Sequence, residues 1–96
     1  MTIEWSDAAT CQLMAVRDYL GKSSPRYARR LVGKILDSVV ILDRMPYFGA
    51  EVPEYGSPQI REIFYDPYRI IYRVRPDKVQ IVSVIHARRQ LPKDPP

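Results

Sequence analysis

The sequence is poor in cysteine, histidine and glycine. It has one cysteine, Cys11, and one histidine, His86, among 96 residues. A single cysteine cannot form an intramolecular disulfide, so nothing indicates an oxidising compartment. One histidine and one cysteine cannot supply a zinc cluster, and the four glycines form no phosphate-binding loop motif. We therefore expect neither a metal site nor a cofactor.

Long apolar runs and targeting signals are also missing. No segment approaches the roughly 18 continuous apolar residues that a membrane span needs. The N-terminus, MTIEWSDAAT, lacks the basic stretch followed by an apolar run that marks a signal peptide. We expect a cytoplasmic protein without a membrane partner. Its net charge of +4 favours acidic partners such as nucleic acid, the ribosome or an acidic protein.

The length suits one domain, residues 1–96, and its first half has the pattern of two helices. A short strand over residues 2–5 precedes Ser6, a helix N-cap. Apolar residues then recur at helical spacing until Gly21. The segment SSPRYARR starts a second helix, with Ser24 as its N-cap. The second apolar stripe consists of Ala28, Leu31, Val32, Ile35, Leu36, Val39 and Leu42.

The second half has the pattern of three β-strands. Residues 60–65, 68–74 and 79–86 are rich in β-branched and aromatic side chains, and each turn between them holds a proline. Short connections predict an antiparallel meander. A long loop, residues 44–58, joins it to the helices. The expected class is therefore α+β, with an N-terminal strand and an antiparallel helix hairpin packed on a three-stranded meander.

The two turns also predict the register of the meander. Partner numbers should sum to 133 across the first hairpin and to 153 across the second. One face then carries Ile70, Tyr72, Ser83 and Ile85 and should pack on the helices, whereas Val84 falls on the other, more open face. That open face, with the residues directly after its last strand, gathers five basic side chains: Arg69, Arg73, His86, Arg88 and Arg89.

A basic sheet face with one imidazole has two interpretations. It can bind phosphates through guanidinium groups, or cleave a phosphodiester with Arg69, His86 and Arg89 as the catalytic residues. Alternatively, it is a solvated face whose arginines pair with Glu62 and nearby carboxylates. The residues alone leave both interpretations open.

Two segments, IREIFYDPYRIIYRV and VQIVSVIHARRQLP, indicate a family. A strand, a "YR" strand and a strand ending in histidine with arginine shortly after resemble the C-terminal signature of the ParE/RelE superfamily of type II toxin–antitoxin toxins. The resemblance extends over essentially the whole chain. It implies a RelE/ParE-like fold and a small basic toxin, linked to growth arrest and plasmid stabilization, that a cognate antitoxin neutralises.

The superfamily divides by target. RelE-like members are ribosome-dependent mRNA endoribonucleases, and ParE-like members inhibit DNA gyrase. Arg69 and Arg89 match two arginines of the nucleases, but Ile60 and Glu62 stand where several of them have lysines, and a later tyrosine has no counterpart. The resemblance therefore implies a ParE-like gyrase inhibitor. A RelE-like nuclease acting on the ribosome with mRNA is the alternative, and a non-toxic antitoxin-binding co-repressor is a further one.

The resemblance also implies where the antitoxin binds. Its C-terminal part would lie as a helix or strand across the helix hairpin and the sheet. Its apolar anchors need exposed apolar surface on this chain. Four aromatic residues are candidates: Tyr27, Tyr47, Phe48 and Tyr55.

Overall fold

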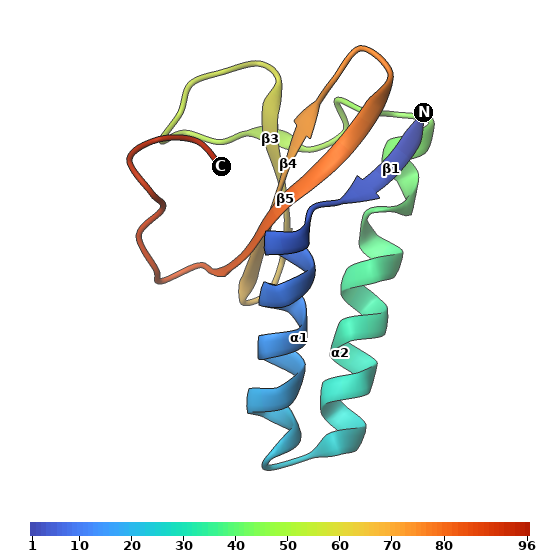
Figure 1. The fold of residues 1–96 in the computed structure, drawn as a ribbon, viewed down its shortest axis with the longest axis vertical. Coiled ribbons are helices and arrows are strands. Elements are labelled where there is room, and N and C mark those ends of the chain that lie inside the picture. Colours follow the sequence, from blue (N-terminus) through green and yellow to red (C-terminus); the bar gives the residue numbers. More distant parts are fainter.

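Two helices and five strands make up the computed structural model, which describes residues 1–96. In chain order the elements are β1 (Thr2–Trp5), α1 (Asp7–Gly21), α2 (Pro25–Ser38), the 3-10 turn η1 (Val40–Asp43), β2 (Ala50–Glu51), β3 (Ile60–Tyr65), β4 (Tyr68–Val74) and β5 (Lys78–His86). The two helices form an antiparallel hairpin that packs on the sheet and projects beyond its end (Figure 1). The α+β class, the N-terminal strand, the hairpin and the meander are confirmed. No helix is both long and apolar enough to cross a membrane.

Serine side chains cap the N-termini of both helices. The Ser6 hydroxyl accepts a hydrogen bond from the backbone N–H of Ala9 at 3.0 Å. The Ser24 hydroxyl accepts one from the N–H of Tyr27 at 3.2 Å, and Pro25 takes the first helical position, where no N–H is needed. Each serine satisfies a donor that the first helical turn leaves free. The helix starts are therefore set locally by the sequence.

The meander is the centre of a larger sheet with strand order β1-β5-β4-β3-β2. β1 pairs in parallel with β5, from Thr2 opposite Lys78 to Trp5 opposite Ile81. β2 adds two residues at the other edge, beside β3. The N-terminal strand, for which the sequence indicated no partner, thus pairs with the last strand and forms one edge of the sheet.

The register of the second hairpin changes partway along β5. Partner numbers sum to 133 throughout the β3–β4 pair, as predicted. Between β4 and β5 they sum to 153 from Val74 opposite Val79 to Tyr72 opposite Ile81, also as predicted. Beyond Tyr72 the sum is 154, because Val82 is an extra residue in β5. This β-bulge moves Val84, Ile85 and His86 to the faces opposite those predicted.

The predicted positions of Val84, Ile85 and His86 are therefore wrong. Val84 pairs with Ile70 and lies in the main core between helices and sheet, not on the outer face, as we call the sheet face that points away from the helices. His86 pairs with Tyr68 and lies on the helix side as well. The predicted grouping of His86 with Arg69 on one face fails for the same reason.

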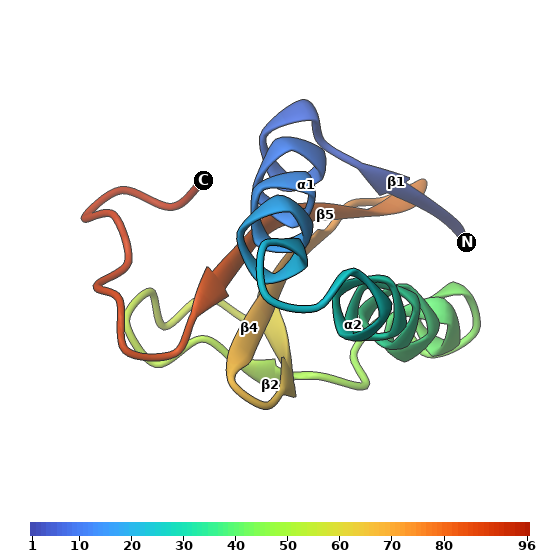
Figure 2. The ribbon, with the colours of Figure 1, turned by 90° about the horizontal axis from the view of Figure 1, so that it is seen from below.

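The outer face has a small apolar core of its own and is not simply open. Its buried residues are Val52, Ile60, Ile71 and Val82, and Tyr55, Ile85 and Leu91 pack against them. Ile85 was predicted on the helix side but lies here. Ser83 was also predicted on the helix side, and although it pairs with Ile71, its hydroxyl donates to the Gln12 side chain of α1 at 3.1 Å, so that prediction holds. Tyr55 comes from the long loop and Leu91 from the C-terminal segment. That segment lies on the side away from α2 (Figure 2). Loop and C-terminal segment together cover part of this face.

Gly49 fastens the long loop to the sheet. Its N–H donates to the hydroxyl of Tyr72, a fully buried residue, at 2.9 Å, and its carbonyl accepts from Arg61 Nε at 2.7 Å. A Cβ at this position would lie 2.4 Å from the carbonyl oxygen of Glu62 and 2.7 Å from the Tyr72 hydroxyl. Only glycine permits this close approach.

Gly49→Ala is expected to lower the free energy of unfolding by about 2 kcal/mol, because the loop must move away from β3. Gly33→Ala is the matched control: no atom lies within 4 Å of a Cβ there. In the middle of α2 it should raise stability by about 1 kcal/mol. Urea unfolding of both variants measures the difference, and equal effects would contradict this role of Gly49.

Candidate functional site

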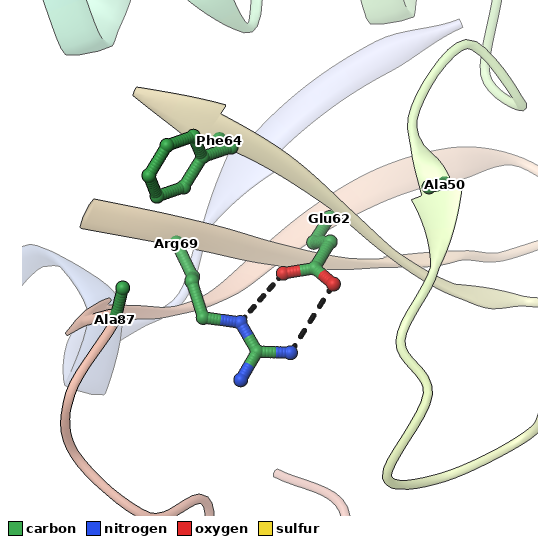
Figure 3. Close-up of a pocket in the computed structure, with 5 residues that line it drawn as sticks. All are labelled: Ala50, Glu62, Phe64, Arg69 and Ala87. Carbon is green, nitrogen blue, oxygen red and sulfur yellow. Dashed lines mark hydrogen bonds and ion pairs between the residues drawn. The ribbon is translucent and has the colours of Figure 1, made fainter. Parts of the chain in front are cut away.

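Arg69 lies at the centre of the outer face and holds two carboxylates. Its Nε and Nη2 donate to Glu62 at 2.6 and 3.1 Å (Figure 3). Its Nη1 and Nη2 donate to Glu54 at 2.7 and 2.8 Å. We call these three residues the Arg69 cluster. Two carboxylates against one guanidinium give it a local charge of −1.

The ion pairs fix the charge state of the cluster. Hydrogen bonds from Arg69 lower the pKa of Glu54 to about 2, and hydrogen bonds to Glu54 and Glu62 raise the pKa of Arg69. Only 12% of the Arg69 side chain is exposed. Glu54 and Arg69 therefore stay ionised at neutral pH. Four of the five N–H donors of the guanidinium are used within the cluster, so neither of its two-donor edges is free for a phosphate. The interpretation in which arginines pair with carboxylates holds for Arg69.

A shallow hollow lies beside the cluster (Figure 3). Its volume is about 430 Å³, and it is lined by Ala50, Glu62, Phe64, Arg69 and Ala87. The charged groups in its wall are the paired ones. Any anion that enters meets the Glu62 carboxylate together with Arg69, so the hollow offers no net attraction for phosphate.

His86 and Arg89 lie at a different place, in a groove between α1 and the end of β5. The groove has a volume of about 480 Å³ and is lined by Gln12, Ala15, Val16, Tyr19, Tyr68, Val84, Ile85, His86 and Arg89. The His86 ring meets the edge of Tyr68 with 5.6 Å between centroids. Its Nδ1 accepts a hydrogen bond from the backbone N–H of Arg88 at 3.1 Å, so a neutral imidazole carries its proton on Nε2. The three predicted catalytic residues are thus divided between two surfaces.

The two other predicted basic residues differ in their surroundings. Arg73 lies on the outer face under the C-terminal segment, where its Nη2 donates to the carbonyl of Pro96 at 3.2 Å. Its Nε is buried without a partner. Arg88 follows β5 and its side chain is exposed and unpaired. The guanidinium of Arg73 therefore already makes a contact within the chain, whereas that of Arg88 is available to a binding partner.

The four aromatic candidates for antitoxin binding differ in their exposure. Tyr27, Tyr47 and Phe48 are 51%, 53% and 55% exposed. Tyr47 stacks with Arg61, whose guanidinium carbon is 5.4 Å from the ring centroid. Tyr55 is half-buried, packs on the outer core and donates its hydroxyl proton to the carbonyl of Pro92 at 2.7 Å. Tyr55 therefore has a structural role, whereas the other three present apolar surface.

Five exposed apolar residues follow one another between the end of α2 and the long loop, and we call them the apolar strip. The strip consists of Leu36, Val40, Met45, Tyr47 and Phe48. Sequence reasoning named Tyr47 and Phe48 among them and missed the other three. Leu36 was predicted to be core, because it continues the stripe of α2. The strip runs from the end of α2 through η1 into the long loop. The sequence did contain a signal for this strip: large apolar residues follow closely on one another in a segment that also holds a proline.

Sequence reasoning also missed Glu54 as a partner of Arg69. A loop residue has no strand register from which its partner can be predicted.

No three histidine, cysteine, aspartate or glutamate side chains come together as a metal-binding cluster. The described surfaces hold paired charges, an apolar strip and a shallow groove.

Known proteins agree with this architecture. The model of a family described as "ParE toxin of type II toxin-antitoxin system, parDE" matches residues 3–91. A curated relative, "Toxin RelE2" of Caulobacter vibrioides (strain ATCC 19089 / CIP 103742 / CB 15), is 34% identical over 91 residues, which are 91% of this chain and 96% of that protein. A solved structure titled "Chromosomal ParDE TA system from P. aeruginosa" superposes with a TM-score of 0.75 at 26% identity, covering 90% of this chain and 95% of that one.

The chain belongs to the ParE toxin family of type II toxin–antitoxin systems. The resemblance seen in the two C-terminal segments is confirmed. One relative is named for RelE and the other for ParDE, so the names do not distinguish a gyrase inhibitor from a ribonuclease.

Glu54→Gln is expected to lower stability at pH 7 by removing the ion pair with Arg69. The pKa of Glu54 is about 2 in the folded chain, below its ordinary value of 4.5. The stabilisation is therefore complete above pH 4.5 and is lost as the pH falls towards 2. Urea unfolding of both proteins at several pH values should show a difference that shrinks on acidification. Glu51→Gln, at an exposed and unpaired carboxylate, is the control. A difference that does not change with pH would contradict the assignment.

Proposed function

We propose that this chain is a ParE-like toxin that inhibits DNA gyrase by binding it, and that a cognate antitoxin neutralises it in the cytoplasm. One observation carries the choice of target: Arg69, the residue that matches a nuclease arginine, is held by two carboxylates. A phosphodiester cleavage site needs cationic groups that are free to stabilise the developing charge. The Arg69 cluster has the opposite net charge.

The position of His86 supports the same choice. A general acid or base must come within hydrogen-bonding distance of the reacting atoms. The bulge at Val82 puts His86 on the helix side, whereas Arg69 lies on the outer face. One phosphodiester cannot contact both side chains. The proposed mode of action is therefore complementarity between surfaces, without a hydrolytic step.

A RelE-like mRNA endoribonuclease is the second candidate. The observation in its favour is that His86 and Arg89 line one groove. In this alternative, Nε2 of His86 exchanges a proton with the ribose or the leaving oxygen, and Arg89 holds the phosphate. A non-toxic co-repressor that only binds antitoxin is a further candidate, favoured by the partial cover over the outer face.

The antitoxin is proposed to dock on the apolar strip. Patches of exposed apolar residues of this kind mark sites of protein–protein contact. Tyr47 and Phe48 lie at one end of the strip, and Leu36 of α2 and Val40 of η1 lie at the other. Amphipathic helices bind such surfaces through anchors at matching spacing. Tyr27 lies away from this strip, at the start of α2.

Purified chain is expected to inhibit supercoiling by gyrase, and the neighbouring gene's product should relieve the inhibition. His86→Gln should inhibit as strongly as the wild type, because the proposal gives the imidazole no chemical role. Supercoiling of plasmid DNA measures both. The nuclease alternative predicts instead that His86→Gln abolishes mRNA cleavage on ribosomes.

These outcomes separate the candidates. Absence of any effect on gyrase from folded chain would contradict the proposal, and mRNA cleavage that needs His86 would replace it. Arg69→Ala is a poorer probe, because it leaves Glu54 and Glu62 unpaired and destabilises the chain. Absence of growth arrest, when the chain is expressed alone, would favour the co-repressor.

Tyr47→Ser with Phe48→Ser is expected to weaken antitoxin binding by at least about tenfold, because aromatic anchors dominate such interfaces. Phe64→Ser is the matched control, since Phe64 is an equally exposed aromatic residue that lies outside the apolar strip. Isothermal titration calorimetry with the antitoxin measures all three proteins. An equal loss in the control would show that the strip is not the docking site.

A further inference from the structure

The projecting end of the helix hairpin carries a separate concentration of positive charge. Between residues 19 and 36 the chain has five basic residues and no acidic one. The five are Lys22, Arg26, Arg29, Arg30 and Lys34. All are exposed, and none forms an ion pair. This end extends away from the sheet into solvent (Figure 1). These five positive charges exceed the net charge of the whole chain, which is +4.

Four of the five charges lie on one face of α2, which we call the cationic face, and Lys22 lies in the connection before it. Arg26, Arg30 and Lys34 follow at a spacing of four, so they lie along one side of the helix. Asp37 closes this face at its C-terminal end. Arg29 and Lys22 extend it towards the loop, where a hollow of about 470 Å³ is lined by Arg17, Asp18, Gly21, Lys22, Pro25, Ala28 and Arg29. The Asp18 carboxylate in that hollow is paired with Arg17 at 3.2 Å.

Gly33 lies in the middle of the cationic face. Its neighbours on the helix surface include Arg29 and Arg30, three and four residues before it. Glycine weakens a helix, yet no atom lies within 4 Å of where its Cβ would be. Packing within the chain therefore does not require glycine here. A bare backbone between arginines allows a partner to approach the helix axis closely.

We propose that the cationic face of α2 binds the phosphate backbone of duplex DNA. A protein partner would need apolar surface at the centre of the interface. Between Lys22 and Lys34 the only exposed apolar side chains are those of Pro25 and Tyr27. Binding of single strands relies on several stacking aromatics, which the segment lacks. A projecting helix of about 10–12 Å diameter with one cationic face instead suits the grooves and backbones of a duplex.

This inference goes beyond the proposed function and does not depend on it. The free chain should bind DNA when neither gyrase nor antitoxin is present. DNA binding would place the toxin on the substrate of gyrase, its proposed target. DNA binding and gyrase inhibition can nevertheless each exist without the other.

The first test is a salt series of binding to a labelled duplex, followed by fluorescence anisotropy. Each lost phosphate contact reduces the slope of log K against log salt by about 0.9. Arg26→Gln with Arg30→Gln and Lys34→Gln should therefore flatten the slope by about 3 and weaken binding at least about tenfold at low salt. The control, Arg44→Gln with Arg75→Gln and Lys93→Gln, removes the same charge elsewhere and should flatten the slope much less.

The second test keeps the charge constant. Gly33→Gln should weaken DNA binding severalfold, because its side chain blocks the close approach, while thermal melting shows an intact fold. Ala8→Gln, at an exposed position of α1, should bind as the wild type does.

Several outcomes would overturn the proposal. They are no DNA binding by the wild type, equal effects of the two triple variants, and no effect of Gly33→Gln. A glutamate-rich peptide or an RNA duplex that binds the cationic face more tightly than the DNA duplex would also assign it to another partner.

Discussion

The extra residue in β5 is the constraint on which the rest of the surface depends. Side chains alternate along a strand, so one inserted residue exchanges the two faces for everything that follows. Val82 inserts there, and Val84 enters the core under the helices. His86 then meets Tyr68, and Ile85 joins the outer core. A sheet without the bulge would bring an imidazole beside Arg69. The observed sheet keeps them on opposite sides.

The Arg69 cluster shows how one ion-pair network decides between two interpretations of the same motif. A "YR" strand offers a guanidinium that either binds phosphate or holds the fold together. Glu62 lies on the neighbouring strand and Glu54 on the long loop, and both carboxylates accept hydrogen bonds from Arg69. The network ties the loop to the sheet, and Gly49 fastens the same loop through Tyr72. In this chain the arginine holds the loop to the sheet, and the proposed binding surfaces lie elsewhere.

The second helix divides those surfaces by charge. Its first three turns present cations around Gly33, and its end, with η1, presents apolar residues that continue to Phe48. The two regions suit different partners: a polyanion at the projecting end of the hairpin, and an apolar helix near the loop. One short helix can serve both, because its buried side (Ala28, Leu31 and Ile35) is independent of the exposed one.

The sequence by itself determined the local features of this protein. Serine caps and apolar spacing fixed both helices, prolines marked the turns, and the "YR" and "IH" strands indicated the family, because each of these signals acts over a few neighbouring residues. It also fixed the register up to Tyr72. Only the tertiary structure decided the bulge, since the run from Ile81 to Ile85 is nearly all apolar and either face could accept it. The same holds for the Glu54–Arg69 pair, which joins residues that no turn or period relates. Partners across long loops are set by packing, and packing is a property of the whole chain.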